Sequence, residues 1–326
     1  MPSHPTPPPG YEWRPARAGD SAALVDLLTA MDATEGLEEV LGLEGAAYQL
    51  AYPGLDPARD TLLAFTPDGA ARAIAWVLGQ PAEDPVRARV WMEAHPGHLH
   101  LEPFLLAWAE ACARPRLTGR GPSGPAHLRQ HIEEHRLRRR RVLEQAGYRH
   151  VRTFAEMQRA LEPPFPGPSP LPAGLQIVPW SPALEEQARL AANEAFALHW
   201  GALPVPPEMW HQRVTASPDF RPDLSRLVAR DGQVLSLCLV GIDAEQNARR
   251  GVAEMWLERI GTIPAYHRRG LATTLVGEVL RAGLAAGLTR AALGVDLENT
   301  TGATALYQRL GFAVTRRTLA YVKEPA

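Results

Sequence analysis

A proline-rich segment near the middle of the chain places the strongest constraint on its fold. From Pro163 to Pro172 the sequence reads Pro-Pro-Phe-Pro-Gly-Pro-Ser-Pro-Leu-Pro. Proline fixes φ and has no backbone N–H, so this segment continues neither a helix nor a central strand and favours an extended polyproline shape. We therefore predict a semi-rigid linker over 163–173, which divides the 326 residues into two halves of ordinary domain size.

The composition is that of a soluble globular protein, with 45% apolar and 21% charged residues. The net charge of −2 gives no reason to expect nucleic acid or an anionic membrane as a partner. No apolar run approaches the roughly 18 residues that a membrane span needs. Residues 1–10 lack the pattern of a signal peptide and are expected to form a disordered tail.

The cysteine content agrees with an intracellular protein. Cys112 and Cys238 are the only cysteines, they lie far apart, and neither has neighbours at metal-ligand spacing. We therefore expect no disulfide framework and no metal site, and we expect the cytoplasm as the compartment.

The C-terminal half alternates strand and helix patterns. Asp231-Gly232 predicts a hairpin between two apolar runs, and Gly311 stands at the expected end of the last helix. The predicted strands are 175–180, 226–230, 234–242, 252–263, 290–296 and 312–323. The predicted helices are 183–200, 207–216, a long one that begins after residue 270, and 302–310.

The segment from Ile260 to Gly287 has the features of an anion-binding site. A strand stops at Pro264, the basic turn His267–Ala272 follows, and a long amphipathic helix begins at once. The first backbone N–H groups of a helix have no partner within the helix, and the helix dipole is positive there. Gly270 and Ala272 leave room for a phosphate to approach the backbone, while the two arginines of the turn add positive charge.

Two motifs of this half resemble those of the Gcn5-related N-acetyltransferase (GNAT) family. The family's acyl-CoA signature is Gln or Arg, two residues, Gly, one residue, then Gly or Ala, and here His267–Ala272 matches it with His267 in place of Gln or Arg. The second motif is Asn299 followed by the helix and turn Ala303–Phe312. The resemblance covers nearly all of 174–326, and the histidine is its one departure.

The resemblance implies acetyl-CoA as co-substrate, no metal, and acetyl transfer to a primary amine. The pyrophosphate of CoA suits the N–H groups around Arg269–Ala272, and the amide-rich pantetheine arm can pair with the strand edge Ile260-Gly261-Thr262 as an added strand does. The cofactor-binding residues expected on this basis are Ile260, Gly261, Thr262, His267, Arg268, Arg269, Gly270, Leu271, Ala272, Asn299 and Tyr307.

The resemblance also implies two catalytic groups. Tyr307 is the expected acid for the leaving thiolate, and its alternative role is core packing. Glu258 is the preferred base, with Glu254 or a water chain as alternatives. The two glutamates share one face of their strand unless a bulge intervenes.

The first helices of this half correspond to the region where the family builds its acceptor wall. His199, Trp200, Trp210 and His211 are therefore candidates to line a substrate pocket. Buried packing is an equal alternative for the two tryptophans.

The N-terminal half repeats the same order of elements. It shows strands near 13–14, 61–65, 72–79, 86–93 and 151–160, with helices at 104–113 and 132–145. The closest local similarity is Val142–Tyr148 with Leu306–Phe312. We infer an internal repeat, with a degenerate GNAT-like domain at 11–162 and a catalytic GNAT domain at 174–326.

The first copy lacks the residues that carry the chemistry of the second. The segment Gly97–Pro103 has no arginine and contains a glutamate, and Leu143 stands where Tyr307 stands. We therefore expect little or no CoA binding there. The basic run Arg136–Arg141 is interpreted as a solvated helix face with acidic partners one turn earlier, rather than as a nucleic-acid site.

The sequence therefore predicts an α/β protein with two tandem GNAT folds, each a mostly antiparallel sheet flanked by helices. The predicted function is acetyl-CoA-dependent N-acetylation of a small-molecule amine. The alternative is a non-catalytic acetyl-CoA-binding or interaction module. Neither nucleic acid nor a membrane is expected as a partner, and the protein is expected to be a monomer or a homodimer.

Overall fold

The computed structural model describes residues 4–36, 42–51, 55–79, 87–117, 120–121, 124–165 and 170–324. Its contacts divide the chain into two compact units. The first unit is Met1–Thr153 with Thr318–Ala326, and the second unit is Phe154–Arg317. The predicted linker 163–173 falls within the second unit, and its residues 166–169 lie outside the described part of the chain.

The sheet of the first unit is mixed. Its strands follow one another across the sheet in the order β1-β2-β3-β4-β7-β14. All neighbouring pairs are antiparallel except β4 with β7, which are parallel. The strands are β1 (Glu12–Arg14), β2 (Thr61–Phe65), β3 (Ala71–Gly79), β4 (Arg87–Ala94), β7 (His127–Glu133) and β14 (Ala313–Lys323), and a small separate sheet pairs β5 (Arg120–Gly121) with β6 (Gly124–Pro125).

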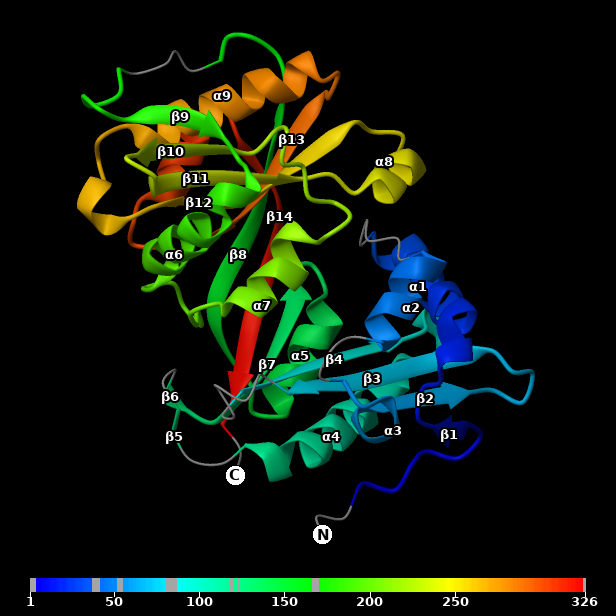
Figure 1. Cartoon of the computed structure of the whole chain (residues 1–326). Coiled ribbons are helices and arrows are strands. Elements are labelled where there is room, and N and C mark those ends of the chain that lie inside the picture. Colours follow the sequence, from blue (N-terminus) through cyan, green and yellow to red (C-terminus); the bar gives the residue numbers. More distant parts are fainter. Residues whose placement is uncertain are drawn as a thin grey trace. The chain divides into compact units, whose positions relative to one another are not determined.

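Helices cover both faces of this sheet. The ribbons of α1 (Ser21–Glu35) and α2 (Leu43–Leu50) lie on one side of β3 and β4, and α4 (Glu102–Ala113) lies on the other (Figure 1). The alternation of the strands explains this, because Ile74 and Trp76 of β3 pack with α1 whereas Ala73, Ala75 and Val77 pack with α4. The remaining helices are α3 (Pro57–Asp60) and α5 (Leu137–Gln145).

The second unit has the corresponding architecture. Its strand order is β8-β13-β12-β11-β10-β9, and only the pair β12 with β13 is parallel. The strands are β8 (Arg149–Ala160), β9 (Gln176–Pro179), β10 (Arg226–Arg230), β11 (Gln233–Gly241), β12 (Glu254–Thr262) and β13 (Arg290–Asp296). The predicted fold class is therefore confirmed, with a mixed rather than a purely antiparallel sheet in each unit.

Two helices sandwich the sheet of the second unit. The ribbon of α9 (Leu271–Ala285) lies on one side of β10–β12 and α6 (Glu185–Phe196) lies on the other (Figure 1). The apolar face of α9, which includes Leu275, Val279 and Leu280, is fully buried in this core. The other helices are α7 (Pro207–Trp210), α8 (Ala244–Arg250) and α10 (Ala303–Arg309).

Two strands pass from one unit into the other. Residues 154–160 of β8 pair with β13 in the second unit, although β8 closes the first half of the sequence. Residues 318–323 of β14 pair with β7 in the first unit, although β14 closes the second half. The compact units therefore differ from the sequence halves, because each half supplies a strand to the sheet of the other.

Two local predictions need correction. The helix predicted at 132–145 begins only at Leu137, because His127–Glu133 forms strand β7. The buried and partly exposed side chains alternate along this strand, so the alternation of Leu128, Gln130 and Ile132 was the missed signal. Helix α8 was also missed; it is a short polar helix in the connection between β11 and β12.

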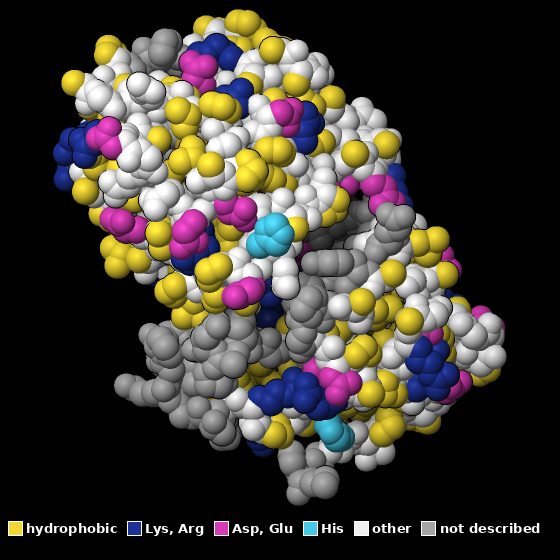
Figure 2. Space-filling view, in the orientation of Figure 1, with side chains coloured by type: hydrophobic (Ala, Val, Ile, Leu, Met, Phe, Trp, Pro, Cys, Tyr) yellow, Lys and Arg dark blue, Asp and Glu magenta, His cyan; other side chains and the backbone are white. Residues whose placement is uncertain are grey.

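The visible surface mixes charges of both signs. On the face shown in Figure 2, basic and acidic side chains are interspersed among apolar and polar ones. This distribution accords with the net charge of −2. Among the helices of the described residues, none has the length and apolar character that crossing a membrane requires.

Candidate active site

A cavity of about 960 Å³ lies in the second unit. Its walls come from the end of β12, the start of α9, the turn between β13 and α10, and the end of α6. The parallel ladder between β12 and β13 covers only Glu254–Trp256 with Arg290–Ala292. The two strands are not paired beyond it, which leaves room for the cavity between a strand edge and two helix N-termini.

The basic turn lines this cavity at the N-terminus of α9. Gly270 is the N-cap of α9 with φ 78°, and Arg268 has φ 57°. A positive φ is costly for arginine, and such strained backbone is found mainly where a ligand site over-determines it. The first free N–H groups of α9 therefore face a pocket that Arg268, Gly270, Leu271 and Ala272 line.

His267, the departure from the family signature, has a defined contact. Its Nε2 lies 2.8 Å from the carbonyl oxygen of Thr262, so the ring N–H donates back to the end of β12. The imidazole thus braces the turn against the strand. Arg269 is the one predicted cofactor-binding residue that does not line the cavity, and its guanidinium instead lies 4.9 Å from the centre of the Tyr266 ring.

Tyr307 projects from α10 into the wall of the cavity. Its side chain is only 6% exposed. Burial raises the pKa of the phenol above its usual range, and the Cys238 thiol adds to this. The hydroxyl therefore keeps its proton at any physiological pH, as a hydrogen donor to a thiolate must.

A β-bulge separates the two glutamates of β12. Leu239 pairs with Arg259 and the next residue, Val240, pairs with Leu257, so Glu258 is the extra residue on its strand. Glu258 lines the cavity, and loss of hydration raises the pKa of its carboxyl, with Asp219 adding to the shift and Arg259 opposing it.

Glu254 points elsewhere. It is 2% exposed and forms ion pairs with Arg250 at 3.3 Å and Arg290 at 3.7 Å. Its carboxylate therefore has a structural role in these ion pairs, and Glu254 does not line the cavity. The Glu258 side chain lies close over Gly241, since a Cβ there would be 3.0 Å from Glu258 Oε1.

The end of α6 and the turn after β13 meet across the cavity. Asn299 Nδ2 lies 3.2 Å from His199 Nε2, and Asn299 Oδ1 accepts from the N–H of Thr301 at 2.8 Å. This second bond fixes the amide, so its NH₂ faces the imidazole and His199 Nε2 is an acceptor. Burial lowers the pKa of His199 against the opposing charge of Asp296, so the ring is neutral.

The other three residues predicted for the acceptor wall differ in their burial. Trp210 is 1% exposed in the core, and His211 is exposed beside Glu185. Trp200 is half-buried, with its ring 6.2 Å from that of Phe154. Of the four candidates, only His199 lines the cavity.

Several cavity residues were not predicted from the sequence. Phe154 comes from β8, a strand that belongs to the N-terminal half of the sequence and was therefore not expected at this cavity. Asp296 ends β13, and Arg309 ends α10. A charged residue at the end of a strand or helix beside a motif was the available signal for both.

The basic run of the first unit is not a solvated helix face. Arg136 and Arg139 are 7% and 2% exposed, whereas Arg138 is exposed. Their partners are Glu93 and Glu102, far away in sequence, so an acidic residue one turn earlier is only a minor contact. Leu143, at the position of Tyr307, is fully buried in the apolar core.

Comparisons with known proteins show what this chain is similar to in sequence and fold. Residues 192–312 match the model of the "Acetyltransferase (GNAT) family". Mycothiol acetyltransferases from Salinispora tropica and Salinispora arenicola are 35% identical over 180 residues and 33% identical over 183 residues. Each match covers 51% of this chain and 53% of the relative, so the chain spans about half the length of the curated relatives it matches.

Two solved structures extend over nearly the whole chain. A GCN5-related N-acetyltransferase from Sphaerobacter thermophilus is 27% identical with a TM-score of 0.78, covering 98% of this chain and 97% of its own. A tandem GNAT protein from the clavulanic acid biosynthesis pathway has a TM-score of 0.71 at 15% identity, covering 97% of this chain and 99% of its own. The resemblance predicted from the sequence is confirmed: this is a tandem arrangement of two GNAT-like folds.

Proposed function

We propose that this chain is an acetyl-CoA-dependent N-acetyltransferase whose second unit moves an acetyl group to the primary amine of a small acceptor. The observation that carries the proposal is the convergence of three features on one cavity. The N-terminus of α9, Tyr307 and Glu258 all line it. An anion seat, a hydrogen donor and a proton acceptor are the parts that acyl transfer from a CoA thioester needs.

The cofactor is proposed to lie between β12 and α9. Its pyrophosphate would accept from the backbone N–H groups of Gly270–Ala272, with Arg268 supplying charge. Its pantetheine amides would pair along Ile260–Thr262, the stretch of β12 beyond the ladder with β13. His267 has a supporting role, because its ring N–H donates a hydrogen bond to the Thr262 carbonyl and so holds the turn in place.

The reaction needs three proton transfers around one exchange of bonds. The acceptor enters as an ammonium ion and gives one proton to the Glu258 carboxylate. The free amine attacks the thioester carbonyl carbon, a C–N bond forms and the C–S bond breaks. Tyr307 gives its proton to the departing thiolate, and the second proton of the amine returns to solvent or to the phenolate.

The raised pKa of the Glu258 carboxyl suits the role of base. A carboxylate of ordinary pKa is too weak a base to deprotonate an ammonium group efficiently, and a higher pKa brings the two closer. The same carboxylate also attracts the cationic acceptor before the transfer.

The acceptor is proposed to bind between the end of α6 and β13, against Phe154, Phe196, His199 and Asp296. The neutral His199 ring and the aromatic walls suit a small polar amine. Because the matched relatives are named for mycothiol, acceptors related to mycothiol are the first compounds to test. We expect the enzyme to act in the cytoplasm, where Cys112 and Cys238 stay reduced.

Release of free CoA thiol from acetyl-CoA, measured with a panel of small amines, tests the proposal. Tyr307→Phe removes only the hydroxyl and is expected to lower kcat by about 10²- to 10⁴-fold without weakening acetyl-CoA binding. Tyr321→Phe is the matched control, since Tyr321 donates to Glu144 in the first unit. Acceptor-dependent thiol release that Tyr307→Phe leaves unchanged contradicts the assigned acid. No release with any amine, despite tight binding, favours the non-catalytic module.

A further inference from the structure

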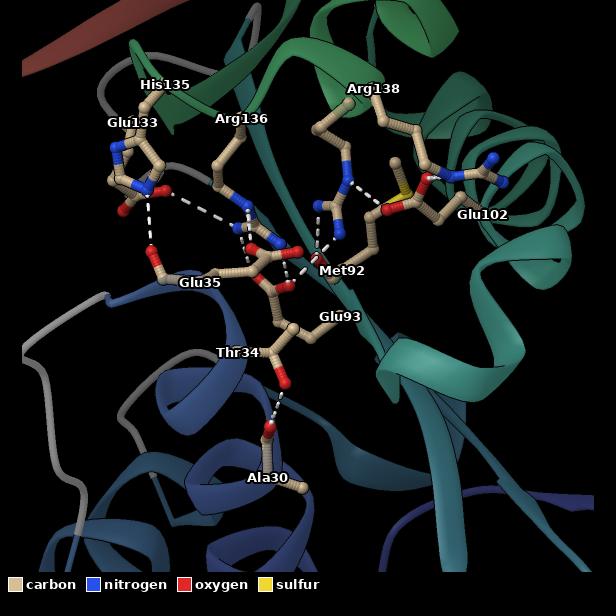
Figure 3. Close-up of polar contacts among 11 residues, drawn as sticks. Ala30, Thr34, Glu35, Met92, Glu93, Glu102, Glu133, His135, Arg136 and Arg138 are labelled. Carbon is tan, nitrogen blue, oxygen red and sulfur yellow. Dashed lines mark hydrogen bonds and ion pairs between the residues drawn. The ribbon is translucent and has the colours of Figure 1, made fainter.

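The first unit contains a buried network of charged side chains that its sequence did not indicate (Figure 3). Arg136 donates to both carboxylate oxygens of Glu93, at 2.9 and 2.6 Å. Arg139 donates to Glu93 at 3.0 Å, to Glu102 at 2.7 Å and to the carbonyl of Met92 at 2.6 Å. These four charged residues are at most 7% exposed.

The network continues at its margin. Glu35 at the end of α1 lies 2.5 Å from Arg136 Nε, Glu133 lies 3.4 Å from Arg136 Nη1, and Arg138 donates to Glu102 at 3.2 Å. Burial alone would raise the pKa of the Glu93 carboxyl, but Arg139 and Arg136 hold it below its usual range. Glu93 is therefore ionised, and the centre of the network is a set of paired charges.

The position of the two glutamates follows from the internal repeat. Strands β4 and β12 end at Ala94 and Thr262, and in both units one residue and then a proline follow. Glu93 therefore stands where Gly261 stands in the second unit. Glu102 begins α4 as Leu271 begins α9.

The position of the two arginines follows from the turns Gly147-Tyr148 and Gly311-Phe312. Counting back from these glycines, Arg139 corresponds to Ala303 and Arg136 corresponds to Thr300. One contact supports this register. His135 corresponds to Asn299, and it contacts the carbonyl of Glu35 at the end of α1 as Asn299 contacts His199 just after α6.

The counterparts of the network share one property. Gly261, Leu271, Thr300 and Ala303 are all uncharged, and all four line the cavity of the second unit. The first unit thus carries two carboxylates and two guanidinium groups at the four positions that bound an open cleft in the second.

We infer that the cofactor cleft of the first unit is filled by its own side chains, so that the chain binds one acyl-CoA, in the second unit alone. This inference rests on the proposed function. The Glu102 carboxylate lies in the first turn of α4, where the helix dipole favours an anion and where a pyrophosphate would otherwise lie. Arg136 at the N-cap of α5 and Arg139 within α5 join that helix to the end of β4. The counterparts of these two elements in the second unit, the end of β12 and the start of α10, both line the cavity.

The guanidinium groups of Arg136 and Arg139 are already hydrogen-bonded within the network, and this explains why an anion would not displace it. A phosphate entering at α4 would repel Glu102 and would compete for guanidinium groups whose donors already reach Glu93, Glu102 and Met92. Separating the pairs would leave buried charges without partners, which is strongly unfavourable. The network thus takes the structural place of the ligand.

Hydrogen–deuterium exchange of the full chain with and without acetyl-CoA tests this inference. We expect slower exchange in 260–275 on addition of acetyl-CoA and no change in 92–105. Slower exchange in both segments would overturn the inference. Slower exchange in neither would agree with a closed first unit and contradict the proposed function, so the two failures are distinguishable.

A pair of neighbouring variants tests whether the network holds the first unit together. Arg139→Ala installs the residue of the second unit and leaves two buried carboxylates short of a partner, so we expect Tm to fall on the order of 10 °C. Arg138→Ala removes an exposed contact to the same Glu102 and serves as the matched control, with a much smaller fall. Equal effects of the two would contradict the network's role. Should Arg139→Ala fail to fold, the exchange experiment on the unmodified chain still decides the inference.

Discussion

The two units place opposite contents in the same architectural position. In the second, the end of a strand, a turn and the start of a helix surround a cavity of about 960 Å³. In the first, the same elements close on Glu93, Glu102, Arg136 and Arg139. The comparison shows that the same scaffold can surround a cavity or a buried charge network, and we infer that side chains at four positions decide between the two.

The largest expected effect concerns the exchanged strand. A fragment of residues 174–326 lacks β8, which leaves β13 with an unpaired edge and removes Ala155, Met157 and Leu161 from the core. Burial of a Met or Leu side chain contributes about 1.5–3 kcal/mol, so several kcal/mol are lost. We expect no cooperative thermal unfolding from this fragment by circular dichroism.

A fragment of residues 149–326 is the control, because it retains β8 whole. We expect it to regain a cooperative transition. Equal unfolding curves for the two fragments would show that the second unit does not depend on the strand from the first half.

The next effect concerns the pH dependence of transfer. Because the base must be ionised, kcat/KM is expected to fall about tenfold per pH unit below the pKa of Glu258. Partial loss of hydration raises that pKa although the side chain is exposed, so the fall should begin at a higher pH than for an ordinary glutamate. Glu258→Gln is expected to lower kcat and to remove this limb of the profile, whereas Glu278→Gln, on the partly exposed surface of α9, should keep it. An unchanged limb in Glu258→Gln would assign the base elsewhere.

A smaller effect is expected from the pair His199 and Asn299. His199→Ala removes one hydrogen bond on the acceptor side, so KM for the amine should rise about two- to tenfold. KM for acetyl-CoA should change little. His199→Gln retains an acceptor for the Asn299 amide and should recover much of the loss.

The pH profile separates positioning from proton transfer at His199. A positioning role predicts that kcat survives in His199→Ala with its acid limb in place. Loss of that limb would make the imidazole the base instead of Glu258.

Local sequence patterns predicted the parts of the site that depend on neighbours in the chain. The strand at 290–296, the basic turn and the start of α9 follow from periodicity, proline and glycine, and the structure has them where expected. The expected cofactor-binding residues also meet at one cavity, apart from Arg269, whereas only His199 of the four acceptor-wall candidates lines it. Their roles in binding and catalysis stay predictions.

Features that depend on distant pairing could not be read in this way. Nothing in the alternation of β8 says that it pairs with β13 rather than with β7, because both partners offer an antiparallel edge. Similarly, the charges of Arg136 and Arg139 predict exposed side chains, because their partners Glu93 and Glu102 are distant in the sequence and only the fold brings them into contact. The bulge at Glu258 is visible only in the register of β11 with β12.

Calorimetric titration of acetyl-CoA into the full chain and into Gly270→Glu tests the central claim most directly. The variant places a carboxylate at the N-terminus of α9, as Glu102 places one at the N-terminus of α4. Residue 270 has a φ of 78°, which only glycine adopts easily. Gly251→Glu, at a glycine with φ 62° and open space around it, controls for strain.

We expect one binding site per chain in the unmodified protein and one in Gly251→Glu. In Gly270→Glu we expect an affinity at least about 100-fold weaker, because repulsion and lost contacts of about 3 kcal/mol act at the N-terminus of α9. Two sites in the unmodified protein, or one undiminished site in Gly270→Glu, would contradict the central claim.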